Sequence, residues 1–104
     1  MLNPFDGDAE VREVLKVLGS YESLHPNAKV KSYRQNSQSI RIRIIDPDFR
    51  KLDKALRHDH IWEILEKLPE DIQSQITVLL LLSPEETQTS FANMDFENPI
   101  PSRL

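Results

Sequence analysis

The stretch ALRHDHIWEIL, residues 55–65, gathers the side chains of this sequence that are best suited to chemistry. It holds Arg57, His58, His60 and the single tryptophan, Trp62. Histidine binds metals and transfers protons near neutral pH, and arginine binds anions. Side chains two residues apart on a helix point about 200° away from each other, so His58 and His60 cannot chelate one ion. We therefore predict no metal site.

The helical phase of this stretch places Arg57 and His58 beside the core. Measured from Ile61 and Leu65, both residues flank the apolar stripe at the start of a helix. We expect them to satisfy backbone groups at the helix junction, with His58 stacking near Trp62. Contact with a ligand or partner is the alternative role for this pair.

The sequence offers little support for catalysis. It has no cysteine, which excludes disulfides, thiolate metal sites and a cysteine nucleophile. It has no GxSxG motif, and its two glycines leave no glycine-rich phosphate loop. We predict that the chain is not an enzyme and carries no cofactor.

A second group of candidate residues lies on a predicted β-hairpin. Ile40, Ile42 and Ile44 alternate with arginines, a period of two that predicts a strand. Residues 28–33 alternate more weakly, and the polar QNSQ at 35–38 joins the two segments as an antiparallel hairpin. If the isoleucines face the core, five residues lie on the opposite face. These are Lys29, Lys31, Tyr33, Arg41 and Arg43.

This hairpin face has three interpretations. Its charges can hold phosphates while its tyrosine stacks on a base. It can also bind a protein partner, or it can be a solvated face whose charges prevent edge pairing. Residues 28–58 hold nine Lys or Arg against three Asp, a local charge of +6, which leaves −10 for the rest of a chain whose net charge is −4. Such a basic middle suits an anionic partner.

The elements that position these residues form a small α+β domain over residues 1–91. In order, they are a helix at 8–18 that ends at Gly19, the hairpin, a short and a longer helix within 48–68, a central strand at 76–82 and a short helix after Ser83. The two middle helices are separate because the apolar stripe changes phase between Leu56 and Ile61. The order α-β-β-α-α-β-α predicts a three-stranded mixed sheet with the helices packed on one face.

Residues 92–104 are predicted to be an extended C-terminal tail. Pro99 and Pro101 prevent a continuous helix and favour an extended chain. Apolar residues such as Met94 and Phe96 suggest that the tail lies along the domain or a partner as a strap.

The segment SIRIRIIDPDFRKLDKALRHDHIW, residues 39–62, resembles the centre of the BolA family. In that family an alternating apolar strand leads to a loop with a Phe, and an Arg-His pair precedes an apolar-aromatic dipeptide in the long helix. Here these features are Ile40, Ile42, Ile44, Phe49, Arg57-His58 and Ile61-Trp62, and Ser83 to Glu86 resembles the family's turn after the last strand. The resemblance covers roughly residues 28–86 and implies a fold similar to the type II KH domain.

The sequence departs from the family at the positions that hold an iron–sulfur cluster shared with monothiol glutaredoxins. The family uses a His at the start of the last strand and a His or Cys in the hairpin loop. Here the matching positions are Gln75 or Thr77 and the QNSQ loop, which offer no such ligand. We expect no cluster sharing with a glutaredoxin. The GXXG loop of nucleic-acid-binding KH domains is also missing.

Together these patterns predict a non-enzymatic binding or regulatory module. The leading hypothesis is that it engages a protein partner through the sheet face and the helix entrance at Arg57 and His58. The alternative is weak, sequence-tolerant nucleic-acid binding by the basic hairpin. The start of the sequence has no signal-peptide pattern and the longest apolar run is short, so we expect a cytoplasmic protein without a membrane span. No motif identifies the partner or the oligomeric state.

Overall fold

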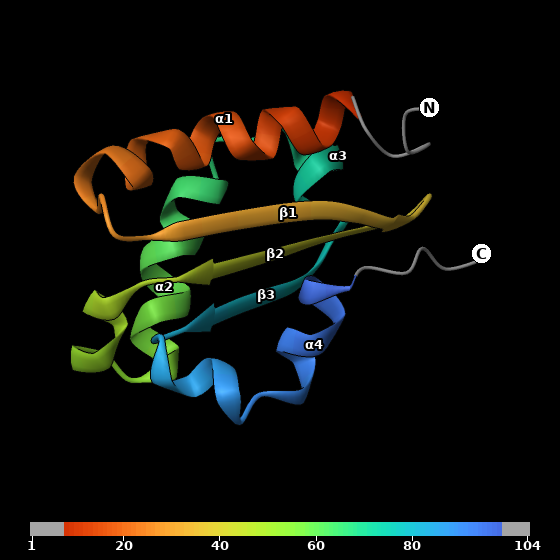
Figure 1. Cartoon of the computed structure of the whole chain (residues 1–104). Coiled ribbons are helices and arrows are strands. Elements are labelled where there is room, and N and C mark those ends of the chain that lie inside the picture. The colour runs from red at the N-terminus through yellow and green to blue at the C-terminus, as the bar shows by residue number, and fades with distance from the viewer. Residues whose placement is uncertain (1–7, 99–104) are drawn as a thin grey trace.

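The computed structural model describes residues 8–98 of the chain. Its elements, in chain order, are α1 (Ala9–Leu24), β1 (Lys29–Asn36), β2 (Ser39–Ile45), the 3₁₀ helix η1 (Pro47–Lys51), α2 (Lys54–Leu65), α3 (Glu70–Gln73), β3 (Ile76–Leu82), the 3₁₀ helix η2 (Glu85–Gln88) and α4 (Phe91–Glu97). The three strands form one mixed sheet, with α2 crossing behind them in the view of Figure 1. The predicted α+β class and three-stranded mixed sheet are confirmed.

β1 and β2 form the predicted antiparallel hairpin. Ile40, Ile42 and Ile44 have no exposed surface, as their period of two requires. Burial of each contributes about 2 kcal/mol. They share one core with residues of α1 and α2, among them Val11, Val14, Leu18, Tyr21, Ile61 and Leu65.

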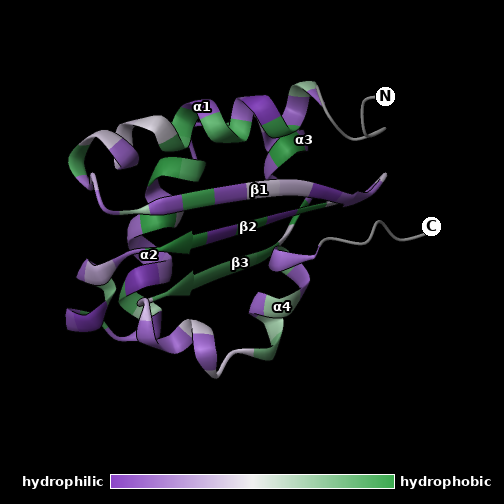
Figure 2. Cartoon of the chain, viewed as in Figure 1, coloured by the Kyte–Doolittle hydropathy of each residue, from purple (hydrophilic) through white to green (hydrophobic). Residues whose placement is uncertain are grey.

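β3 runs parallel to β2, and the sheet order is β1-β2-β3. The prediction that residues 76–82 form a central strand is therefore wrong: β2 is central and β3 is an edge strand. Figure 2 shows β3 as apolar along most of its length, the pattern of a strand covered on both faces. β3 has this apolar pattern although it is an edge strand. Val78 and Leu80, which point away from the core, are only half-buried.

α1 is longer than predicted, because it continues through Gly19 to Leu24. Glycine within a helix costs about 1 kcal/mol relative to alanine. Tyr21 lies one turn further along the same buried stripe as Val14 and Leu18. Burial of this ring offsets the cost of the glycine, so the helix does not end there.

A short and a longer helix form as predicted, as η1 and α2, but the predicted position of the break is wrong. It lies at residues 52–53, and α2 continues without interruption from Leu56 to Ile61. Leu56 is 46% exposed, so it is not part of the buried stripe of α2. Asp53 caps α2, its carboxylate accepting the Leu56 backbone N–H at 2.9 Å. The predicted short helix after Ser83 forms as η2, and at its start the Glu86 carboxylate accepts the Ser83 backbone N–H at 2.7 Å. The single turn α3 has no counterpart in the prediction.

The C-terminal segment differs from the predicted extended tail, because residues 91–97 form α4. The Ser90 hydroxyl caps this helix by accepting the Asn93 backbone N–H at 3.3 Å. A proline restricts the residue before it, and the helix ends at Glu97, before that position. α4 packs on the sheet face opposite α1 and α2 (Figure 1), so the helices cover both faces rather than one. The rest of the predicted strap, 99–104, lies outside the described residues.

Candidate functional site

Four of the predicted binding residues meet on one face of the sheet. Tyr33 lies opposite Arg41, and Lys31 lies opposite Arg43, in the register of β1 and β2. All four side chains lie on the face away from the isoleucines. Lys29 is exposed on the same face at the start of β1. We refer to Lys31, Tyr33, Arg41 and Arg43 as the basic face.

α4 covers the basic face through one aromatic side chain. Phe96 is 1% exposed and packs edge-on against Tyr33, with the ring centroids 5.3 Å apart. The guanidinium carbon of Arg43 lies 5.6 Å from the centroid of the same ring, within the range of a cation–π contact. As a result Arg43 is only 7% exposed, and the basic face is not the open surface that one interpretation of the sequence predicts.

The polar contacts of α4 match the charge of the basic face. Arg43 donates from Nη1 to the Asn93 side-chain oxygen at 2.7 Å and to the Glu97 carboxylate at 2.9 Å. Lys31 donates from Nζ to the backbone carbonyl of Phe96 at 2.5 Å. This last contact lies near the helix C-terminus, where the helix dipole favours a cation. An acidic helix is thus docked on a basic sheet.

The docking of α4 leaves some hydrogen-bonding capacity unused. Among the described residues, three buried side-chain atoms lack a partner: Gln35 Oε1, Arg41 Nε and Arg43 Nε. An unpaired buried polar group costs about 1–3 kcal/mol. Beside α4 is a polar pocket of about 120 Å³, which is lined by Tyr33, Gln35, Arg41, Asp95 and Asn98. The interface is complementary in charge but incompletely hydrogen-bonded.

Arg57 does not belong to the basic face. Its Nε donates to the backbone carbonyls of Phe49 and Leu52, each at 3.0 Å. Its Nη1 donates to the carbonyl of Leu81 at 3.1 Å and to the Glu86 carboxylate at 2.6 Å. Arg57 therefore ties η1, β3 and η2 to α2, which confirms the predicted contacts with backbone groups at the helix junction.

His58 stacks on Trp62 as predicted, with the ring centroids 6.0 Å apart. The prediction that His58 lies beside the core is wrong, because its side chain is exposed. It borders a shallow pocket of about 200 Å³, which is lined by Lys54, His58 and residues 79–82 of β3. None of these residues belongs to the basic face, which lies on the other side of the sheet from α2. The structure does not bring the helix entrance and the basic face into one surface.

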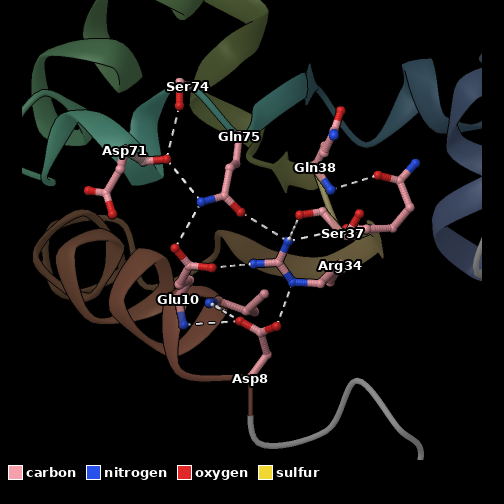
Figure 3. Close-up of polar contacts among 10 residues, drawn as sticks. Asp8, Glu10, Arg34, Ser37, Gln38, Asp71, Ser74 and Gln75 are labelled. Atoms are coloured by element: carbon pink, nitrogen blue, oxygen red, sulfur yellow. Dashed lines mark hydrogen bonds and ion pairs between the residues drawn. The ribbon is translucent and has the colours of Figure 1, made fainter. Parts of the chain in front are cut away.

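Arg34, which is not among the predicted binding residues, anchors a second polar cluster (Figure 3). Its guanidinium pairs with Asp8 at 2.5 Å and Glu10 at 2.8 Å, and donates to the Gln75 side-chain oxygen at 3.0 Å. Burial raises the pKa of Asp8, but the bonds from Arg34 and the Val11 N–H outweigh it, so the pKa is lowered. The cluster joins α1, the hairpin and the loop before β3.

This cluster includes a position at which the BolA resemblance would place an iron–sulfur ligand. Gln75 donates from its amide to Glu10 at 2.8 Å, besides accepting from Arg34. The neighbouring candidate, Thr77, shares a hydrogen bond with the Ser39 hydroxyl. Both side chains are engaged in contacts that hold the fold together.

Among residues 8–98, one group of side chains has the composition and spacing of a metal site. It consists of His25, Asp46 and Asp48, which lie at the end of α1 and the start of η1. This group does not include His58 or His60, the two histidines considered as a metal pair from the sequence.

Comparisons of the chain with family models, with curated proteins and with solved structures find no match. The resemblance to the BolA family remains a proposal that rests on sequence motifs alone. Within residues 8–98, no helix has the length and apolar character needed to cross a membrane.

The residues of α4 that complete the site are not among the predicted binding residues, although the segment that contains Phe96 was predicted to lie along the domain or a partner. Asn93, Asp95 and Glu97 supply its polar contacts, and Phe96 supplies its apolar anchor. A signal was present, because Ser90 is a strong helix cap and Asn93 and Phe96 are spaced to share a helix face. The two following prolines led to the prediction of an extended chain instead.

Proposed function

We propose that this chain is a non-enzymatic binding module whose basic face binds an acidic, phenylalanine-bearing segment of a protein partner. α4 occupies the basic face until the partner displaces it. The observation that best supports this proposal is the docking of α4, in which Phe96 packs on Tyr33 while Glu97 pairs with Arg43. A partner segment of the same chemistry can make the same contacts.

The contacts of α4 suit an exchangeable occupant. α4 has seven residues, too few for a helix that is stable by itself. Its outer side leaves Phe91 88% exposed, and two guanidinium Nε atoms beneath it are unpaired. Because α4 belongs to the same chain, it acts at an effective concentration in the millimolar range. A partner must therefore bind more tightly than α4 or make additional contacts.

Nucleic-acid binding by the basic hairpin is the second candidate function. It is favoured by the exposed Lys29 and by the position of Asp95 and Glu97, whose carboxylates lie where phosphates would sit on Arg41 and Arg43. It is the weaker candidate because Tyr33 already packs against Phe96. Single-stranded nucleic acid stacks its bases on free aromatic faces.

A binding titration separates the two candidates. The probes are a fluorescent peptide with the sequence of residues 89–98 and a fluorescent single-stranded oligonucleotide, each titrated with the wild-type chain and with Phe96→Ala. We expect the peptide to bind Phe96→Ala about tenfold more tightly than wild type, because the variant holds its own helix less often. In the double variant Phe96→Ala/Arg41→Glu, binding of the peptide should be lost.

The same titration has outcomes that oppose the proposal. Tight oligonucleotide binding to Phe96→Ala that weakens steeply with salt would favour the second candidate, since each phosphate contact releases counterions. If the peptide binds neither protein, the basic face does not recognise acidic segments and the first candidate is wrong.

A further inference from the structure

We propose that His25, Asp46 and Asp48 form a binding site for a divalent first-row metal ion, for which Zn²⁺ is the best fit. One nitrogen or oxygen atom from each residue takes part, and all three atoms lie within 4.8 Å of one another. His25 follows α1, while Asp46 caps η1 and Asp48 lies within it. None of the three residues belongs to the basic face, so the inference does not rest on the proposed function.

The distances in this group suit a small ion. His25 Nδ1 lies 2.9 Å from Asp48 Oδ2 and 3.1 Å from Asp46 Oδ2. Ligands at zinc's usual bond lengths in a tetrahedral site are about 3.3 Å apart. On binding, the two nitrogen–oxygen distances would therefore lengthen by a few tenths of an ångström, and the two carboxylate oxygens, which lie within 4.8 Å of each other, would adjust to the same spacing. The Asp48 side chain is 62% exposed and is free to make that shift.

Hydrogen bonds fix the orientation of the buried Asp46 carboxylate, as a metal ligand requires. Asp46 accepts the Tyr21 hydroxyl on Oδ2 and the Asp48 backbone N–H on Oδ1, the latter at 2.9 Å. The Tyr21 ring also stacks on His25, with centroids 4.0 Å apart and planes inclined by 11°. These contacts fix the orientation of the carboxylate and of the imidazole, as outer hydrogen bonds do in established metal sites.

The charges of the group also favour a cation. His25 brings at most one proton on Nδ1 to two carboxylate oxygens, both within 3.1 Å. Asp46 is buried, and a buried carboxylate is costly unless its charge is compensated. A divalent ion contacts both carboxylates and the neutral imidazole together. Three protein ligands and the exposed side of Asp48 leave a fourth position for water.

Isothermal titration calorimetry with zinc sulfate tests the site, using the full chain after dialysis against a chelator. We expect one Zn²⁺ per chain, with affinity falling about 10- to 100-fold or more in His25→Gln and in Asp48→Asn, since removal of a ligand costs at least as much as removal of an outer hydrogen bond. His58→Gln and His60→Gln are the matched controls and should bind as wild type does. Circular dichroism of each variant establishes that it is folded.

Imidazole nitrogen NMR gives the second measurement. Zinc should shift the Nδ1 resonance of His25 and leave the rings of His58 and His60 unchanged. The proposal is overturned if wild type takes up no zinc at millimolar concentration. It is also overturned if the folded His25→Gln and Asp48→Asn variants bind as wild type does, or if the shifted resonance belongs to another histidine.

Discussion

Arg43 of the central strand lies beneath Phe96 of the C-terminal helix, its guanidinium carbon 5.6 Å from the ring centroid. Strand alternation alone points Arg43 toward solvent. The helix instead buries it and pairs it with Asn93 and Glu97. These are the contacts that, in the proposed function, an acidic, aromatic segment of a partner would make in place of α4.

Substitution of Phe96 by alanine should release α4 while leaving the domain folded. Loss of a buried Phe costs about 3–5 kcal/mol in a core, but here the ring anchors only α4. Hydrogen exchange should therefore accelerate at residues 91–97, whereas the amides of β2 stay protected. Phe91→Ala, at an 88% exposed position, is the control and should change neither region. Loss of protection throughout the sheet would mean that α4 is part of the cooperative core.

Adjacent positions of β2 should respond oppositely to aspartate. Ile42→Asp places a carboxylate in the core, where Ile42 has no exposed surface, and should unfold the domain because its cost is comparable to total stability. Arg41→Asp changes a half-buried residue on the other face and should leave the circular dichroism spectrum folded. The reverse result would mean that the strand faces are exchanged.

Arg34→Ala should lower the free energy of unfolding by about 2–3 kcal/mol. Breaking a buried ion pair costs about 3–5 kcal/mol, and we reduce this value because Glu10 is partly exposed. Urea denaturation measures the change, with Lys16→Ala on the exposed side of α1 as the control. Arg34→Lys should recover little of the loss, since lysine cannot make the forked contacts of a guanidinium. Full recovery with lysine would show that charge alone matters.

Acid should destabilise the domain through Asp8 and Glu86. The Ser83 backbone N–H and Arg57 lower the pKa of Glu86 from its ordinary 4.5, and the pKa of Asp8 is lowered from 3.8. A carboxylate whose pKa is depressed on folding stabilises the protein above its unfolded pKa, and this stabilisation is lost as pH falls through the folded pKa. The urea concentration at the midpoint of unfolding should therefore decrease as the pH is lowered below about 4.5. Glu86→Gln should show a smaller decrease, and an identical decrease would exclude a contribution from Glu86.

Local patterns in the sequence predicted the parts of the fold that depend on local physics. The alternation of Ile40, Ile42 and Ile44 predicted the buried face of β2. The change of apolar phase after Leu56 predicted two helices, but it misplaced the break, because Leu56 is an exposed residue of α2. The edge position of β3 was not predictable in this way, because a run of leucines has the same pattern in a central or an edge strand. Strand order depends on contacts distant in sequence.

The candidate sites were harder to predict, because each is assembled from distant segments. Strand alternation predicted that Lys31, Tyr33, Arg41 and Arg43 share one face. The apolar residues of the C-terminal segment predicted that it lies along the domain or a partner, but not that it forms a helix on this face. The group of His25, Asp46 and Asp48 forms only because α1 continues past Gly19 and brings its C-terminal end to η1. A helix that ended at Gly19, as predicted, would not place His25 at a helix end beside η1, so this group was not predicted.

The sharpest test of the proposed binding function is an NMR titration of isotope-labelled Phe96→Ala with the unlabelled peptide of residues 89–98. Amide shifts then report where the acidic segment binds. We predict that they cluster in β1 and β2, at residues 29–35 and 40–45, and that Arg41→Glu removes them. Shifts confined to the other surface, at residues 54–58 and 79–82, or no shifts at all, would contradict the assignment of the basic face as the binding site.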